Sequence, residues 1–169
     1  MPIIETLLQE LEQEAATTRR VLERVPDADL GWKPHPKSMS LGQLALHIAT
    51  VPAAVAEIAS GPGLETPPAF EQPAAQTAAE LVPTLQQSVA RARTLLGGMD
   101  DGLALELWTL KSGGQVLMTL PRAAFLRAVM LNHWYHHRGQ LSVYLRQLNV
   151  PVPSIYGPSA DENPFAAAV

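Results

Sequence analysis

The sequence predicts an all-α fold, a four-helix bundle with one long crossover connection and a short β-hairpin between the third and fourth helices. Four segments place apolar residues three and four positions apart, which is the period of an amphipathic helix; they span residues 2–25, 40–60, 77–96 and 121–149. A stretch rich in Pro, Gly and Ala at 61–76 separates the second segment from the third, and helical bundles use such long crossovers. We expect one domain over residues 1–169, because a chain of this length can bury a single core.

Prolines and capping residues mark the boundaries of the first two helices. Pro2 lies in the first helical turn, where proline is tolerated, and Pro26 ends the first helix. Ser40 and Gln43 have the spacing of a capping box, in which each side chain accepts a hydrogen bond from the other residue's main-chain N–H. Pro52 lies inside the second helix and predicts a kink or a lost hydrogen bond there.

The third and fourth helices are bounded by similar signals. Thr77 and Glu80 again have the capping-box spacing and predict the start of the third helix, although Pro83 favours a kink or a later start. Pro121 opens the fourth helix. The tail at 151–169 is rich in proline, so we expect it to lie on the surface without regular structure.

Two β-prone runs, at 105–110 and 116–120, lie between the third and fourth helices. Gly113 and Gly114 stand between them, and two glycines in this position indicate a β-hairpin. A lone hairpin is only marginally stable in water, so we expect it to pack on the helices.

The composition narrows the class of protein. Hydrophobic residues make up 47% of the chain and charged residues 17%, which is typical of a globular protein. The net charge is −4 and the Lys and Arg residues are scattered, so the chain is not expected to bind nucleic acid, which requires a basic patch. The chain contains no cysteine, which excludes disulfides, cysteine zinc sites and a cysteine nucleophile.

The sequence also indicates where in the cell the protein is expected. Residues 1–5 lack the basic and apolar regions of a signal peptide. The most apolar stretch, at 44–59, is interrupted by His47, Pro52 and Glu57, and we expect it to be too short to span a bilayer. We therefore expect a cytoplasmic protein without a membrane partner.

Three histidines lie on the helix faces that are predicted to point into the core. His133 and His137 are four positions apart, so they lie one above the other on one face, and His47 replaces an apolar residue in the second helix. A buried imidazole without a partner costs about 1–3 kcal/mol, and one shared metal ion would satisfy all three. Neutral imidazole suits Zn, Cu, Fe and Ni, and three histidines leave a coordination position open for water or substrate.

The alternative is that these are ordinary histidines bonded to main-chain or side-chain groups. His136 is a competing ligand, but it lies off the core stripe, which favours a supporting role, and His35 is expected to be exposed between two prolines. The His-x-x-x-His spacing also occurs in metalloproteases. Trp134 stands where those enzymes need a glutamate, so a protease is excluded.

A metal-bound histidine normally donates its other ring N–H to a supporting group. The candidates for that group are Asn132, Gln140 and Glu162. Arg138 and Gln140 could bond a substrate or support the ligands. The three tryptophans, at 32, 108 and 134, are expected in the core.

Four blocks of the sequence form a recognisable set: Trp32-Lys33-Pro34, Ser40-Leu41-Gly42-Gln43-Leu44-Ala45-Leu46-His47-Ile48-Ala49, His133-Trp134-Tyr135-His136-His137-Arg138-Gly139-Gln140-Leu141 and Tyr156-Gly157-Pro158-Ser159. Together they resemble the DinB/YfiT-like family over nearly the whole chain. The resemblance implies a four-helix bundle with a long crossover and a divalent metal ion bound by three histidines, which by position are His47, His133 and His137. We expect the ion to be Zn or Ni ahead of Fe or Mn.

The same resemblance implies a homodimer that acts on a small-molecule substrate. Some members of the family are S-transferases that use low-molecular-weight thiols such as bacillithiol or mycothiol, one relative is a maleylpyruvate isomerase, and others are proposed hydrolases. The family name implies no DNA binding.

Three functional hypotheses follow from the sequence. The first is a metal-dependent enzyme, a thiol S-transferase or a hydrolase, in which the ion acts as a Lewis acid and any thiol comes from outside the cysteine-free chain. The second is a non-enzymatic metal-binding protein of the stress response, in which the metal joins two helices. The third is an interaction module without metal.

Overall fold

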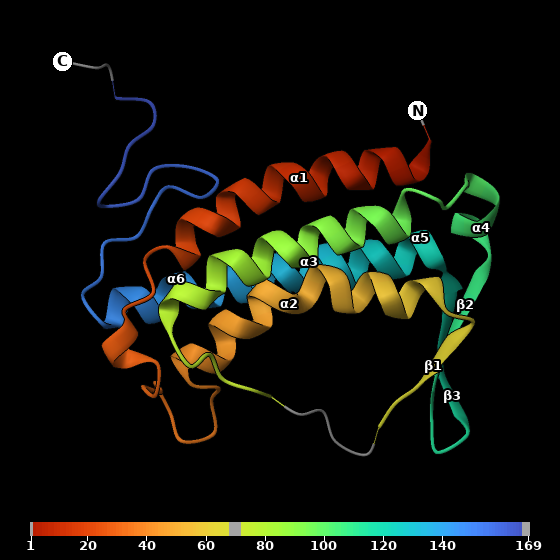
Figure 1. Ribbon diagram of the computed structural model, residues 1–169, viewed down its shortest axis with the longest axis horizontal. Helices are drawn as coiled ribbons and strands as arrows, with labels where there is room; N and C mark the ends of the chain where they lie inside the picture. Colours follow the sequence, from red (N-terminus) through yellow and green to blue (C-terminus); the bar gives the residue numbers. More distant parts are fainter. Residues whose placement is uncertain (1, 68–71, 167–169) are drawn as a thin grey trace.

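The computed structural model describes residues 2–67 and 72–166, which form a mostly helical protein with a small three-stranded sheet at one end (Figure 1). The helical elements are α1 (Ile3–Leu22), η1 (Asp27–Asp29), α2 (Leu41–Ser60), η2 (Ala78–Glu80), α3 (Leu81–Leu96), α4 (Asp101–Leu105), α5 (Arg122–Phe125), η3 (Leu126–Asn132) and α6 (His133–Gln147). α2 packs against α3 and against η3 and α6, while α1 covers α3 and α6. Apolar side chains from all of these helices form the core between them.

The second helix begins where the sequence predicts, and Pro52 lies inside it. Ser40 and Gln43 form the predicted capping box, with the Gln43 N–H donating to the Ser40 hydroxyl and the Ser40 N–H donating to the Gln43 amide oxygen. Pro52 lies inside α2, and Ser88 of α3 compensates for the interrupted hydrogen bonding around it. The Ser88 hydroxyl accepts from the N–H of Ala53 at 2.9 Å and donates to the carbonyl of Thr50 at 3.2 Å. Ser88 thus joins α3 to α2 beside the proline.

The predicted capping box at Thr77 is wrong, since the Thr77 side chain makes no capping hydrogen bond. Asp27 accepts the N–H of Ala78 at 2.6 Å instead, and Glu80 accepts the N–H of Gln76 at 2.6 Å. A short 3₁₀ turn, η2, therefore precedes the true start of α3 at Leu81. This is the later start that Pro83 favoured, because proline is tolerated in a first helical turn.

The predicted hairpin is confirmed and gains a third strand. β2 (Leu107–Ser112) pairs antiparallel with β3 (Gln115–Pro121), and both turn glycines have positive φ, 57° at Gly113 and 77° at Gly114. β1 (Gly63–Glu65) pairs parallel with β2. The expectation that 61–76 is irregular throughout is therefore wrong for β1; residues 68–71 of that stretch lie outside the described residues.

Two side chains fasten the sheet to the C-terminal end of α2. The indole N–H of Trp108 donates to the carbonyl of Ile58 at 3.2 Å, and its ring stacks on Phe125 with centroids 4.1 Å apart. The guanidinium of Arg122 donates to the carbonyls of Ala59 and Gly61, both at 3.1 Å. It thereby satisfies carbonyls at the end of α2 that have no partner within the helix. The hairpin therefore packs on the helices, as expected.

α2 is long and apolar enough to cross a membrane by length and composition alone, with 20 residues and a mean hydropathy of 1.4 in its most apolar window. The expectation that this stretch is too short is therefore wrong. In the structure 56% of that window is buried, which is also what a core helix of a folded protein shows.

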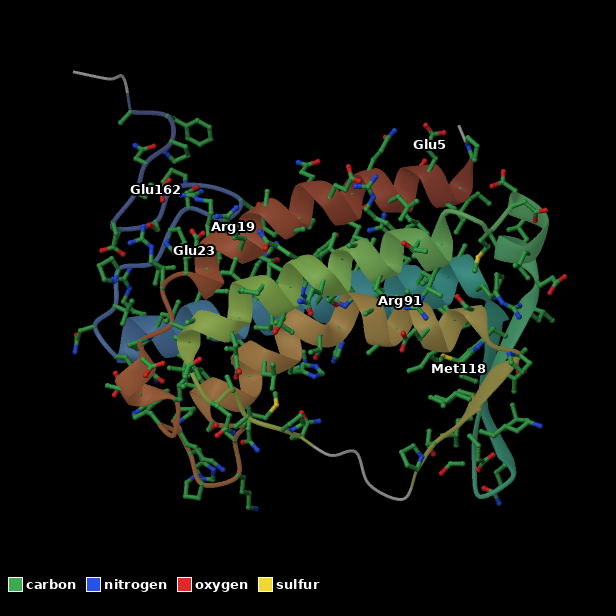
Figure 2. The ribbon with its side chains drawn as sticks, viewed as in Figure 1. Glu5, Arg19, Glu23, Arg91, Met118 and Glu162 are labelled. Atoms are coloured by element: carbon green, nitrogen blue, oxygen red, sulfur yellow. The ribbon has the colours of Figure 1, made fainter. Side chains whose placement is uncertain are left out.

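The tail after α6 has no helix or strand among residues 151–166, as expected. Ion pairs hold it on the helices: Asp161 pairs with Arg146 of α6, and Glu162 pairs with Arg20 of α1 at 2.6 Å. Figure 2 shows Glu162 beside the C-terminal half of α1, near Arg19 and Glu23. The tail thereby covers one end of the helices.

Candidate metal centre

His47 of α2 and His133 and His137 of α6 meet between the two helices. The ring centroids lie 5.2 Å apart for His47 and His133, 4.7 Å for His47 and His137 and 4.4 Å for His133 and His137. One nitrogen from each ring lies within 4.8 Å of the other two. A tetrahedral zinc ion bound at about 2.0–2.1 Å separates its ligands by roughly 3.4 Å, so the three imidazoles reach one ion after side-chain shifts on the order of 1 Å.

A widened helical turn precedes the two histidines of α6. Residues 126–132 are π-helical, and the N–H of His133 donates to the carbonyl of Ala128, five residues back. Such turns occur often at functional sites. The sequence predicted one uninterrupted helix here, and its apolar spacing carries no signal of the extra residue.

The hydrogen bonds of His137 fix which of its nitrogens faces the cluster. Its Nδ1 lies 2.9 Å from Oε1 of Gln140, and because that oxygen can only accept, Nδ1 carries the hydrogen. The other nitrogen, Nε2, therefore has a free lone pair. It lies 2.9 Å from Nε2 of His133.

The ring nitrogens of His133 are incompletely paired among the described residues. Its Nδ1 is buried without a well-formed hydrogen bond, although the carbonyl of Val129 faces it and opposes the lowering of its pKa. If Nδ1 bears the hydrogen, it points at this carbonyl, and the lone pairs of the two Nε2 atoms of His133 and His137 then face each other. If Nε2 bears it, Nδ1 and the carbonyl present two lone pairs. A metal ion held by His133 and His137 would remove the conflict, so the residues present fit such an ion.

The environment keeps the three imidazoles in the neutral form that binds metals. Burial lowers the pKa of His47 to about 4, with a further contribution from repulsion by His137 and His133. Burial also lowers the pKa of His133 and of His137, and in His137 the bond to Gln140 opposes that effect. All three side chains are therefore uncharged near neutral pH, with lone pairs available.

Of the three proposed supporting groups, only Gln140 contacts a ligand histidine among the described residues. Its Nε2 donates to the hydroxyl of Tyr144 at 3.2 Å, which continues the chain of bonds away from His137. Asn132 is exposed, and Glu162 is engaged by Arg20.

The remaining histidines and Arg138 lie outside the cluster. His35 is exposed as expected. His136 is also exposed, and its ring lies 4.9 Å from that of His137. Arg138 is 1% exposed and pairs with Glu14 at 2.5 Å. Both suggested roles for Arg138, contact with a substrate and support of the ligands, are therefore wrong.

The three tryptophans have separate positions. Trp108 and Trp134 are completely buried, as expected. Trp32 is only partly buried and meets the ring of Tyr144 edge-on, with centroids 5.4 Å apart.

A cavity of about 530 Å³ adjoins the cluster, and His47 and His133 form part of its wall. The rest of the wall comes from α2, the small sheet, α5, η3 and the segment between β1 and η2. The volume lies in the range of small-molecule sites. The sequence predicted the histidines but not this space, because the sheet that closes it packs against α2 through residues distant in the chain.

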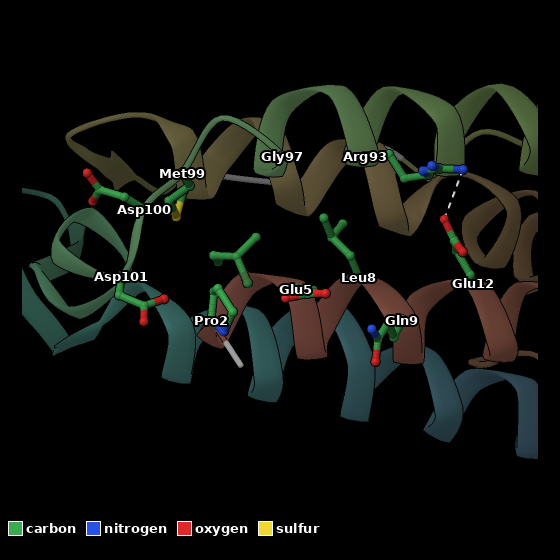
Figure 3. Close-up of a pocket in the computed structure, with 11 residues that line it drawn as sticks. Pro2, Glu5, Leu8, Gln9, Glu12, Arg93, Gly97, Met99, Asp100 and Asp101 are labelled. Atoms are coloured by element: carbon green, nitrogen blue, oxygen red, sulfur yellow. Dashed lines mark ion pairs between the residues drawn. The ribbon is translucent and has the colours of Figure 1, made fainter.

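A second hollow, of about 740 Å³, lies between the N-terminal half of α1 and the end of α3 (Figure 3). Its described lining contains Glu12 paired with Arg93 at 2.9 Å, together with Asp100 and Asp101, and no histidine. Although it is the larger space, its lining offers no comparable set of ligands. The cavity beside the histidines is therefore the better candidate for chemistry.

This mostly helical fold with a three-histidine cluster has known relatives. The family model described as the DinB family matches residues 1–164, and the chain belongs to that family. The Bacillus subtilis (strain 168) protein named "Uncharacterized protein YrdA" is 29% identical over 163 residues, covering 94% of this chain and 91% of that protein.

Solved structures share the fold. A DinB-like protein from Bacillus cereus ATCC 10987 superposes with a TM-score of 0.68 and 23% identity, covering 90% of this chain and 97% of that one. A mutant of the mycothiol-dependent maleylpyruvate isomerase superposes with a TM-score of 0.54 and 15% identity, covering 90% of this chain and 63% of that one. At these identities the likeness extends to the fold alone.

Proposed function

We propose that His47, His133 and His137 bind one divalent metal ion, and that the protein is a metal-dependent enzyme acting on a small molecule. The observation that carries the proposal is the meeting of three neutral imidazoles beside a cavity of about 530 Å³. An all-nitrogen ligand set favours Zn or Ni, with Fe next, over Mn, which prefers oxygen ligands.

The chain's own residues prepare this site. Gln140 holds Nδ1–H of His137 and thereby directs the lone pair of Nε2 into the cluster. When bound, an ion supplies Lewis-acid catalysis. The chain has no cysteine, so the nucleophile is a low-molecular-weight thiol or water from solution. The mycothiol dependence named for the isomerase of similar fold supports the thiol S-transferase as the first reaction to test and a hydrolase as the second.

We also propose the setting in which the site works. The chain forms one domain, its long helices form a four-helix bundle, and two copies associate in the cytoplasm. Exposed apolar side chains of the sheet region support the homodimer, rather than a face of α1 or α3; they are Leu105, Leu107, Val116 and Leu117.

Elemental analysis of purified protein tests the metal proposal. We expect about one divalent ion per chain, a loss of at least about tenfold in metal affinity in His47→Ala and His137→Ala, and little change in His136→Ala. His136 is the matched control because it is an exposed histidine next to His137. Equal metal content in all four proteins would exclude the site.

A conjugation assay tests the reaction. The metal-loaded protein is incubated with bacillithiol, mycothiol or glutathione and a chlorinated or epoxide electrophile, and the conjugate is measured by mass spectrometry. We expect conjugate from the wild type and from His136→Ala but not from His137→Ala. Absence of conjugate with every thiol, with the metal confirmed, would exclude the transferase and leave ester and amide hydrolysis to be assayed.

The non-enzymatic alternative has its own signature, because the ligands come from two helices. A purely structural ion would raise the unfolding free energy as RT ln(1 + [L]/Kd). A structural ion would also have no exchangeable water bound to it. Water-proton relaxation measurements on a Mn- or Co-substituted protein show whether such a water is present.

A further inference from the structure

The cavity beside the histidines is mostly apolar, and the sixteen described residues that line it include no Asp, Glu, Lys or Arg. The hydroxyl of Thr50 is already engaged, since it donates to the carbonyls of Leu46 and His47 at 3.0 and 3.1 Å. The remaining polar side chains of the described wall are His47 and His133, which could hold an ion, and the uncharged Thr66 and Gln72.

Charge decides which molecules can enter such a space. A charged group that leaves water without finding a partner costs several kcal/mol. One anionic head could be compensated by an ion held at the histidines. A second charge further along the molecule would meet apolar side chains from α2 and the sheet, such as Val55, Leu110 and Met118.

We propose that the cavity binds the uncharged, apolar body of the substrate, with a single polar head directed at His47 and His133. This inference rests on the proposed function of the site. Dicarboxylates and other molecules with two separated charges are therefore outside the substrate class. Low-molecular-weight thiols such as bacillithiol carry several polar and charged groups, so in a thiol-dependent reaction the cavity holds the apolar electrophile rather than the thiol.

The wall contributed by the sheet is fixed in place before any ligand binds. Trp108 of β2 is bonded to the carbonyl of Ile58, and Arg122, which follows β3, is bonded to the end of α2. Leu110 and Met118 are paired across the hairpin and line the cavity. Figure 2 shows Met118 at the end of α2 nearest the sheet. A preformed apolar wall reduces the ordering cost of binding an apolar molecule.

Displacement of a neutral, apolar fluorescent probe, N-phenyl-1-naphthylamine, tests the inference on the metal-loaded protein. Octanoate and octanedioate have the same apolar chain and carry one and two carboxylates, so they form a matched pair of competitors. We expect octanoate to displace the probe at a concentration at least about tenfold lower, because the second carboxylate of octanedioate has no cationic side chain to pair with in the described wall.

Variants of Ala54 test whether the probe binds in the cavity. Ala54 lines the cavity yet is exposed, so a larger side chain fills the space without disturbing the core. Ala54→Phe and Ala54→Glu should weaken binding of the neutral probe at least about tenfold. Ala90→Phe and Ala90→Glu are the controls, since Ala90 is an exposed helical alanine outside the cavity, and they should leave binding unchanged.

The outcomes separate this inference from the proposed function, because metal content is measured on the same samples. Unchanged probe binding in both Ala54 variants, or equal affinity for the monocarboxylate and the dicarboxylate, would overturn the apolar substrate class even if the histidines hold a metal. Loss of probe binding in the Ala54 variants of a protein that takes up no metal would support the apolar cavity and overturn the metal proposal instead.

Discussion

The indole N–H of Trp134 donates a 2.8 Å hydrogen bond to the main-chain carbonyl of Ile48. A regular helix would pair that carbonyl with the residue four positions later, but Pro52 has no N–H to give. Ile48 follows His47 and Trp134 follows His133 in the chain, so this bond joins α2 to α6 directly beside two of the three histidines. Because Pro52 has no N–H, the carbonyl of Ile48 is free to accept from Trp134, and this bond aligns α2 with α6 at the cluster.

Replacing Trp134 should weaken both the fold and the metal site. Trp134→Phe leaves the carbonyl of Ile48 buried and unpaired, which should lower the unfolding free energy by about 1–3 kcal/mol. Metal affinity should fall as well, because His47 and His133 lose the bond that aligns them. Urea unfolding and competition with a chelator measure the two effects.

The matched control for that variant is Trp108→Phe. Trp108 is also fully buried and also donates to a carbonyl of α2, that of Ile58, but at the sheet end of the helix. It should lose comparable stability and keep its metal affinity. An equal loss of metal affinity in both variants would show that Trp134 acts only through general stability.

Gln140 should set the metal affinity through His137 without touching the ion. Its Oε1 accepts from Nδ1 of His137 at 2.9 Å. Gln140→Leu removes the acceptor and should weaken metal binding about 10–100-fold, whereas Gln140→Glu keeps an acceptor and should preserve or tighten it. Isothermal titration of metal-free protein measures the affinities. Weakening of the same size in both variants would contradict the role of Gln140.

Much of the fold follows from local sequence signals, and its departures have physical causes. The capping box at Ser40 formed because the two side chains and the helix start are adjacent in the chain. The similar signal at Thr77 failed because the side chain of Glu80 accepts from the N–H of Gln76 rather than from that of Thr77, while Asp27, distant in sequence, accepts from the N–H of Ala78. β1 was missed because its three residues form a strand only through pairing with β2.

The candidate site divides in the same way. Helical spacing places His133 and His137 on one face, and the core stripe of the second helix orients His47 toward them. The π-helical turn before His133 and the choice of Gln140 over Asn132 both depend on packing between helices, which a single sequence does not display. Arg138 follows His137 in the sequence, yet its side chain points toward α1, where it pairs with Glu14.

The metal-free protein should lose stability as the pH falls from about 7 to about 4, partly through His47. Burial, with repulsion from His137 and His133, lowers the pKa of His47 in the folded state to about 4. In the unfolded chain the same imidazole takes up its proton near its usual pKa of about 6.5. Protons therefore bind the unfolded state first across this range and favour unfolding, and below it the contribution stays constant.

The His47→Gln variant isolates that contribution. Unfolding free energies of both proteins are measured in chelator across the same pH range. The difference between them should shift in favour of the variant as the pH falls, because the variant lacks the titrating group. A difference that stays constant with pH would contradict a lowered pKa for His47.

Arg138 should matter for stability and not for metal. Its guanidinium is buried between α1 and the tail, where it pairs with Glu14 at 2.5 Å and donates to the hydroxyls of Thr18 at 3.1 Å and Tyr156 at 2.5 Å. Tyr156 in turn donates to Glu14 at 2.9 Å, so one buried ion pair joins α1, α6 and the tail.

Arg138→Met should therefore lower the unfolding free energy by about 3–5 kcal/mol, because it leaves the carboxylate of Glu14 buried without its partner. The double variant Arg138→Met with Glu14→Leu should recover most of that loss, since both charges are then absent. Metal content should equal that of the wild type in each, because the ion pair lies apart from the histidine cluster. Denaturant unfolding and elemental analysis check the two expectations. A drop in metal content while the protein is still folded would place Arg138 back among the groups that support the ligands.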